Sequence, residues 1–198
     1  IAAQDYSMNG EINIHNIQWY ITPILNGMIR IGSQEEKELL FRAFIEQDES
    51  FEYKKRAAKD KPAEIIQESI YERVARLCKN AKSRQDKQKE KSVKQIVGAV
   101  QSIQNNDKVI MIDTSDILDS ALTGVAAMKI AEIFNKPCIL LNKFLNRETG
   151  KFTYGGSARN INHSPIDSFK DIVNSTKVFN FGKGHPNAFG VNLDLDKK

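Results

Sequence analysis

The sequence is poor in cysteine and has no long apolar run. Its 198 residues include two cysteines, Cys78 and Cys138. They are too few and too isolated for a disulfide framework or a zinc site, and they indicate a reduced, cytoplasmic setting. No apolar segment reaches the roughly 18 residues that span a bilayer, and no signal peptide is visible, so no membrane partner is indicated. Because the first residue is Ile1 rather than methionine, we expect a fragment or a processed product.

The size of the chain allows one or two domains, and its basic runs allow either a solvated surface or a surface that contacts nucleic acid. A chain of 198 residues can bury the core of one large domain or of two small ones. The net charge is only +4, but basic residues gather in residues 53–56 and 79–94. Such runs are commonly solvated helix faces, and contact with nucleic acid is the sharper alternative.

The first third of the chain contains a strand signal and a helix signal. Residues 12–31 begin as an apolar, β-rich segment that Pro23 interrupts, which is typical of a strand ending in a proline turn. Ser33 followed by Glu36 is a capping-box pattern and predicts a helix start. Apolar residues at helical spacing in 39–44 are interpreted as the core face of that helix.

Residues 63–104 are predicted to form one long helix, starting near Pro62. Apolar residues follow helical spacing at both ends, whereas residues 82–92 contain no apolar residue, proline or glycine. A helix that is polar all round between two amphipathic ends is typical of an exposed connector. Unbroken, it would extend about 60 Å. The alternative is two helices joined by a disordered basic hinge.

One face of this predicted connector is basic. The stripe consists of residues three or four apart: Arg84, Lys87, Lys91 and Lys94. Such a stripe suits the phosphates of a passing nucleic-acid strand, and binding through it should be salt-sensitive and independent of sequence. No aromatic residue interleaves with it, so the stripe supplies no base stacking.

From residue 108 the pattern becomes α/β. Residues 109–112 and 138–141 are predicted as buried strands, and residues 121–134 as the helix between them. A strand, helix and strand of this length predict parallel strands joined by a right-handed crossover. A further short helix is predicted from Ser164 and Pro165.

Two glycine-rich stretches are candidates for anion binding. Residues 155–160 follow a predicted strand at 152–154 and include Arg159, whose guanidinium suits bidentate phosphate contact. Residues 179–190 predict a strand, a tight loop around His185 and a second strand. Backbone N–H groups at this loop, with the imidazole, would form a phosphate cradle. The alternative is that His185 is an ordinary turn residue.

These two stretches resemble elements of the domain that accompanies the DHH phosphoesterases. Gly156-Ser157-Ala158-Arg159 is similar to the family's G-S-x-R-S element, with Asn160 in place of the last serine. Gly184 to Gly190 is similar to G-G-H-x-x-A-x-G, with Lys183 in place of the first glycine. Lys183 would either add positive charge or tighten the loop.

Two further stretches resemble RecJ-type single-strand-specific exonucleases. Residues 23–30 keep the spacing of the P-x-x-N-x-x-x-R element, with Asn26 and Arg30 at its polar positions. Residues 122–127 are similar to the G-V-x-G-x-x-A helix, in which Gly124 would permit close packing of the helix on the sheet.

The resemblance implies an α/β fold in which a long connector helix joins a small mixed-sheet domain. Residues 1–60 would be the tail of the DHH catalytic domain, 61–105 the connector, and 106–198 the DHH-associated, substrate-binding domain. It further implies a 5′ exonuclease that hydrolyses single-stranded DNA in repair and recombination, with Mn²⁺ or Mg²⁺ in the full-length enzyme. No Asp-His-His motif occurs here, so this chain would bind substrate, hold neither metal nor catalytic residues, and work with its own N-terminal DHH domain.

Within that scheme, Arg159 and His185 would bind the phosphate near the scissile bond. The turn backbone at Ser157 and Gly184 would help to place this phosphate. Asn26 and Arg30 would line the opposite wall of the groove.

Two alternatives remain open. One is a DHH-type phosphodiesterase for short oligonucleotides or cyclic dinucleotides, against which the 23–30 element and the connector argue. The other is a non-catalytic single-strand DNA-binding module. The oligomeric state is open.

Overall fold

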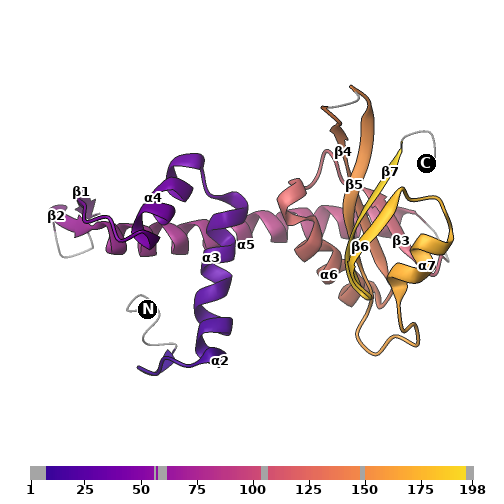
Figure 1. Cartoon of the computed structure of the whole chain (residues 1–198), viewed down its shortest axis with the longest axis horizontal. Coiled ribbons are helices and arrows are strands. Elements are labelled where there is room, and N and C mark those ends of the chain that lie inside the picture. The colour runs from indigo at the N-terminus through magenta and orange to yellow at the C-terminus, as the bar shows by residue number, and fades with distance from the viewer. Residues whose placement is uncertain (1–7, 56, 58–61, 104–106, 148–149, 195–198) are drawn as a thin grey trace. The chain divides into compact units, whose positions relative to one another are not determined.

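The computed structural model describes residues 8–55, 57, 62–103, 107–147 and 150–194. The chain divides into two compact units, residues 1–87 and 88–198 (Figure 1). In the described ranges no helix combines the length and the apolar character that crossing a membrane requires.

The first unit opens with helical turns where the sequence indicated a strand. Helix α2 (Ile14–Asn16) continues into the π-helical segment η2 (Ile17–Ile21) and α3 (Thr22–Ile31). The strand prediction for this segment is wrong because Pro23 lies in the first turn of α3, where the missing N–H donor costs nothing. Proline here begins an element instead of ending one.

Helix α4 (Gln34–Phe44) starts at the predicted capping box. The Ser33 hydroxyl accepts a hydrogen bond from the Glu36 N–H at 3.2 Å, and the Glu36 carboxylate accepts one from the Ser33 N–H at 2.9 Å. The prediction of this helix start is confirmed.

The long helix α5 (Ile70–Ser102) is continuous over 33 residues, including the polar segment 82–92. The hinge alternative is therefore wrong. The helix starts later than predicted because residues 64–69 form strand β2 (Glu64–Ser69), which pairs antiparallel with β1 (Ser50–Lys55). A second capping box marks the change: the Ser69 hydroxyl accepts from the Glu72 N–H, and the Glu72 carboxylate accepts from the Ser69 N–H at 2.8 Å.

The core of the first unit lies between α3, α4 and the first half of α5. It contains Met28, Leu40, Ile70, Val74, Cys78 and Ala81. Gly27 lets α3 approach α5 closely, since a Cβ there would lie 2.9 Å from the Lys82 Cα.

The second unit is a five-stranded mixed sheet with the order β3-β4-β5-β7-β6. Its elements are β3 (Ile110–Asp113), the 3₁₀ turn η3 (Ser120–Leu122), α6 (Thr123–Phe134), β4 (Cys138–Leu145), β5 (Phe152–Arg159), α7 (Phe169–Ser175), β6 (Phe181–His185) and β7 (Ala188–Asp194). Strands β3 and β4 are parallel, as the crossover prediction requires, and the other pairs are antiparallel. The predicted α/β fold class is confirmed.

Helices α6 and α7 lie on opposite sides of this sheet (Figure 1). On the α7 side, buried side chains from the helix and three strands form one core: Ile139, Leu141, Tyr154, Ala158, Phe169, Val173, Phe189, Val191 and Leu193. Helix α7 begins at Phe169, after the Ser168 cap, rather than at the predicted Ser164 and Pro165. The α6 side carries the side chains of the remaining strand positions, and α6 packs there on β4 and β5.

Candidate functional site

The first glycine-rich stretch is a strand and not a turn. Residues 155–159 continue β5, which pairs with β4 on one side and β7 on the other. Gly156 is required by this pairing, because a Cβ there would lie 2.0 Å from the Leu140 carbonyl oxygen. Its backbone groups therefore serve the sheet, and the prediction that a turn at Ser157 presents them to a ligand is corrected.

The second stretch is a hairpin whose turn falls after the histidine. Residues 181–185 form β6, Pro186 and Asn187 connect the strands, and β7 begins at Ala188. The predicted loop at Gly184 is therefore part of a strand. Gly184 has a φ of +134° and lies close to Phe189, so this position demands glycine for backbone reasons.

Strand register brings the predicted residues of the second unit together. Arg159 is opposite Ala188 on β7, and Ala188 is opposite His185 on β6. Ser157, Gly190 and Lys183 form the next row. Because directly opposite and alternate residues share a face, Ser157, Arg159, Lys183 and His185 all lie on the α6 side of the sheet. We call these four residues the sheet site.

The middle strand of the sheet site carries only small residues on this face. Ala188 and Gly190 separate the β5 side chains from the β6 side chains. Two strand spacings place the Arg159 and His185 Cα atoms about 10 Å apart. Lys183 and His185 are exposed, and Arg159 is half-buried. The result is two polar walls over a floor that no large side chain fills.

The start of α6 closes one side of the sheet site. A Cβ on Gly124 would lie 2.7 Å from Nη2 of Arg159, so glycine leaves the space that the guanidinium occupies. Thr123 and Ser157 share a hydrogen bond of 3.3 Å between their hydroxyls, and Nη1 of Arg159 donates to the Ala158 carbonyl at 2.7 Å. Sequence reasoning assigned Gly124 only a packing role and missed Thr123, although both lie in the 122–127 motif.

Asn160, which replaces the usual serine of the family element, connects β5 to the hairpin. Its N–H donates to the Asn187 carbonyl at 2.9 Å, and its side-chain amide donates to the Asn187 side chain at 2.9 Å. These bonds hold the Arg159 end of β5 against the turn that follows His185.

The other predicted site residues form two groups. Asn26 and Arg30 lie in the first unit, and the basic stripe on α5 is divided between the two units. Asn26 and Arg30 are four residues apart on α3, so they share a helix face, and Arg30 is exposed. All four stripe residues are exposed on α5. Two of them are paired: Arg84 with Glu36 at 2.6 Å and Lys94 with Glu90 at 2.9 Å. Functions for both groups remain predictions.

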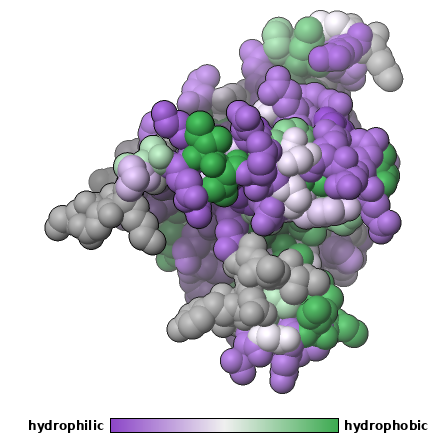
Figure 2. Space-filling model, turned by 90° about the vertical axis from the view of Figure 1, so that its left-hand side faces the viewer, coloured by the Kyte–Doolittle hydropathy of each residue, from purple (hydrophilic) through white to green (hydrophobic). Residues whose placement is uncertain are grey.

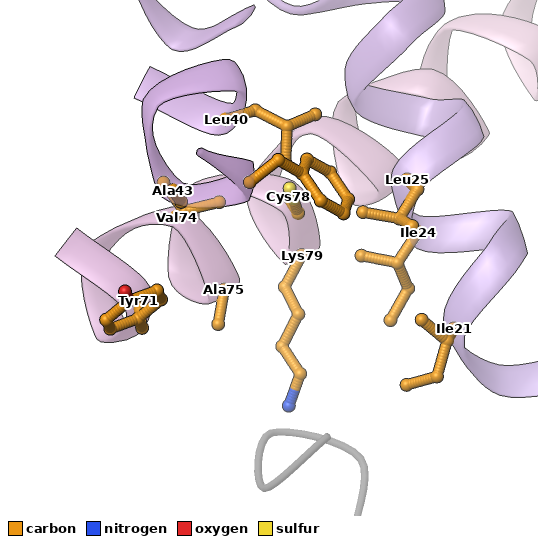
Figure 3. A pocket seen from close by; sticks show the side chains of 11 residues that line it. Ile21, Ile24, Leu25, Leu40, Ala43, Tyr71, Val74, Ala75, Cys78 and Lys79 are labelled. Atoms are coloured by element: carbon orange, nitrogen blue, oxygen red, sulfur yellow. The ribbon is translucent and has the colours of Figure 1, made fainter. Parts of the chain in front are cut away.

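An apolar pocket of about 260 Å³ lies between α3, α4 and α5 in the first unit (Figure 3). Figure 3 shows Ile21, Ile24 and Leu25 on one side, with Lys79 extending between them and Tyr71. Burial raises the pKa of the Cys78 thiol to about 11. The thiol therefore stays protonated near neutral pH.

Two of the acidic residues near β3, Asp113 and Asp119, have structural partners. The Tyr154 hydroxyl donates to the Asp113 carboxylate at 2.7 Å, and the Asp119 carboxylate caps η3. In the part of the chain that the structure describes, no three His, Cys, Asp or Glu side chains gather as metal ligands would.

The chain is similar in sequence and in fold to part of some known proteins. No protein-family model matches the chain. It is 35% identical over 189 residues to proteins named as the single-strand DNA-specific exonuclease YorK, from Bacillus subtilis strain 168 and from Bacillus phage SPbeta. The chain is homologous to part of these exonucleases. The match covers 94% of this chain but only 32% of the relatives, so the chain spans about a third of their length.

Solved RecJ structures share the fold. RecJ from Thermus thermophilus in complex with Mn²⁺ has a TM-score of 0.62 and 15% identity, covering 97% of this chain and 24% of that one. The Mg²⁺ complex gives 0.60 over 25% of that chain. A further exonuclease RecJ bound to manganese gives 0.57 over 40%. The predicted resemblance is confirmed as homology to part of the YorK exonucleases and as a fold shared with part of RecJ.

Proposed function

We propose that this chain is the substrate-binding portion of a RecJ-like 5′ exonuclease that hydrolyses single-stranded DNA. The homology to YorK and the RecJ fold support the class of enzyme. The observation that carries the proposal is the register that aligns Arg159 and Lys183 with His185 on one sheet face, with only Ala188 and Gly190 between them.

The sheet site acts on a DNA phosphate. The Arg159 guanidinium donates two parallel hydrogen bonds to phosphate oxygens, and Lys183 and His185 approach the same group from β6. The small floor residues let the phosphate lie close to the sheet. These contacts hold the strand in position and offset the negative charge of the phosphate. They involve no base edge and are independent of sequence.

We place the metal in the N-terminal DHH domain that the resemblance implies. A divalent ion such as the Mn²⁺ or Mg²⁺ in the RecJ structures would activate water and neutralise phosphoryl charge when bound. Among the described residues, no three His, Cys, Asp or Glu side chains gather as ligands for such an ion would. Arg30 and Asn26 contact the strand from the first unit, and the stripe on α5 contacts further phosphates.

Binding to fluorescent oligo(dT) tests the sheet site. The Arg159→Ala/His185→Ala variant should bind at least about tenfold more weakly, because it loses charge-assisted contacts. Lys129→Ala is the control, since Lys129 is exposed on α6 and pairs with Glu132. Equal affinity of the double variant and the parent would disprove the assignment.

Cleavage assays test the enzyme class. The full-length protein with Mn²⁺ should degrade long single strands in preference to dinucleotides, and the same double substitution should slow it. Preference for dinucleotides would instead support the oligonucleotide phosphodiesterase.

A further inference from the structure

A cleft of about 620 Å³ lies beside the β1–β2 hairpin in the first unit. Its lining comes from the hairpin and from one face of α5: Tyr53, Lys54, Arg76, Asn80, Ser83 and Arg84. Arg76, Asn80 and Arg84 are each four residues apart, and Ser83 is three residues from Asn80, so the helix residues lie on one side of α5. We call these six residues the hairpin cleft.

The hairpin cleft presents cations and neutral donors but no carboxylate. Two guanidiniums, an ammonium, an amide and a hydroxyl line it beside the tyrosine. The acids that pair with its arginines are set back: the side chain of Glu68 is 5% exposed and that of Glu36 16%, against 30% for Arg76 and 48% for Arg84. Its accessible surface is therefore cationic and suits an anionic ligand.

The cleft is built rigidly around Arg76. This side chain donates to both carboxylate oxygens of Glu68, and its Cζ atom lies 3.9 Å from the centroid of the Tyr53 ring. The pair fixes the tyrosine in place, half-buried with part of its surface lining the cleft. The same arrangement recurs one turn earlier, where Arg73 lies over Phe51 at 4.5 Å.

We propose that the hairpin cleft binds a segment of single-stranded nucleic acid, with a base stacked on Tyr53 and phosphates on Lys54 and Arg84. An aromatic ring beside a track of cations is the combination that binds single strands without sequence preference. The basic stripe on α5 lacks an aromatic residue in its own sequence, and folding of the hairpin brings Tyr53 to it. Seen from the side that carries β1 and β2, the surface is mainly hydrophilic (Figure 2).

This inference rests on the proposed function for the identity of the polymer, but it concerns a different site. The cleft residues all lie in the first unit, whereas the sheet site lies in the second. The two sites can therefore be tested by separate substitutions.

Oligo(dT) binding at several salt concentrations tests the cleft. Arg84→Gln and Lys54→Gln should each weaken binding and reduce the slope of log K against log salt by about 0.7, as expected for one lost phosphate contact. Tyr53→Leu should weaken binding about fivefold or more with an unchanged slope, and Tyr53→Phe should keep the parent affinity. Lys129→Gln is the matched control, because it also removes one charge from an exposed ion pair. Arg76 is left intact, since its loss would strand the buried Glu68 carboxylate.

Photo-crosslinking gives an independent readout. Oligonucleotides carrying 5-iodouracil should crosslink to the peptide that contains Tyr53. Absence of that crosslink together with parent affinity in the Tyr53 and Arg84 variants would overturn the inference, however Arg159→Ala behaves. Binding of poly-glutamate with the same losses would also overturn it, in favour of an acidic protein segment. Loss of affinity only in the cleft variants would support the cleft and refute the sheet site.

Discussion

At the scale of single residues, three glycines of the second unit lie where a Cβ would meet a neighbouring group. Gly156 and Gly184 looked like turn residues, but both lie in strands, where neighbouring backbone leaves no room for a Cβ. Gly124 looked like a packing residue, but its neighbour is the Arg159 guanidinium. The sequence shows that a side chain is missing, whereas only the fold shows what occupies the space.

Gly124→Ala should weaken binding of single-stranded DNA several-fold. The added methyl would lie 2.7 Å from Nη2 of Arg159, so the guanidinium must move from its place at the start of α6. Fluorescence anisotropy with oligo(dT) measures the effect. Gly98→Ala is the control, because nothing lies within 4 Å of a Cβ there and α5 should gain up to about 1 kcal/mol of stability. Parent affinity in Gly124→Ala would show that Arg159 does not act from this position.

Cys138 should make stability fall as pH rises. Burial raises the pKa of its thiol to about 12, whereas the thiol of the unfolded chain titrates near 8.5. Between these values the unfolded state loses the proton and the native state keeps it, so deprotonation favours unfolding. Urea unfolding at pH 8 and pH 10 should show a smaller loss for Cys138→Ala than for the parent. Parallel losses would contradict the assignment.

At the scale of elements, helix starts with side-chain caps could be predicted and strand extents could not. Ser33 and Glu36 predict the start of α4, and Ser69 and Glu72 have the same spacing at the start of α5. The prediction of α5 instead followed apolar residues at helical spacing and placed the start too early. The apolar residues at helical spacing in the predicted long helix begin with Ile66, which lies in β2. A few apolar residues fit a strand and a helix equally well, and pairing with β1 decides between them.

Removal of the Ser69 cap should destabilise the first unit. Ser69→Ala leaves the Glu72 N–H without the hydroxyl acceptor and should lower the free energy of unfolding by about 1 kcal/mol. Ser83→Ala, in the exposed middle of α5, should instead be neutral or slightly stabilising, because alanine is the better helix former. Urea denaturation followed by circular dichroism compares the two. Equal stability of both variants would show that α5 does not depend on its cap.

At the scale of the whole molecule, the order of motifs predicted the relationship and the fold class. The predicted division at residues 60 and 105 remains a prediction. The boundary between the two compact units falls within α5, between residues 87 and 88, so each unit includes one part of that helix. The strand register aligns Arg159 with His185 across three strands. It could not be predicted because the glycines in β5 and β6 indicate turns, so the ends of these strands could not be located from the sequence.

Binding by this chain should not require a divalent metal. In the proposed function, the sheet site and the stripe would contact phosphate directly through guanidinium, ammonium and imidazole groups. Affinity for oligo(dT) should therefore be the same in EDTA and in Mn²⁺ at matched ionic strength, while it falls steeply as monovalent salt rises. Arg159→Ala serves as the reference for a lost phosphate contact. A large gain in affinity on adding Mn²⁺ would mean that a metal ion bridges this chain to the strand, and the separation of substrate binding from metal chemistry would have to be abandoned.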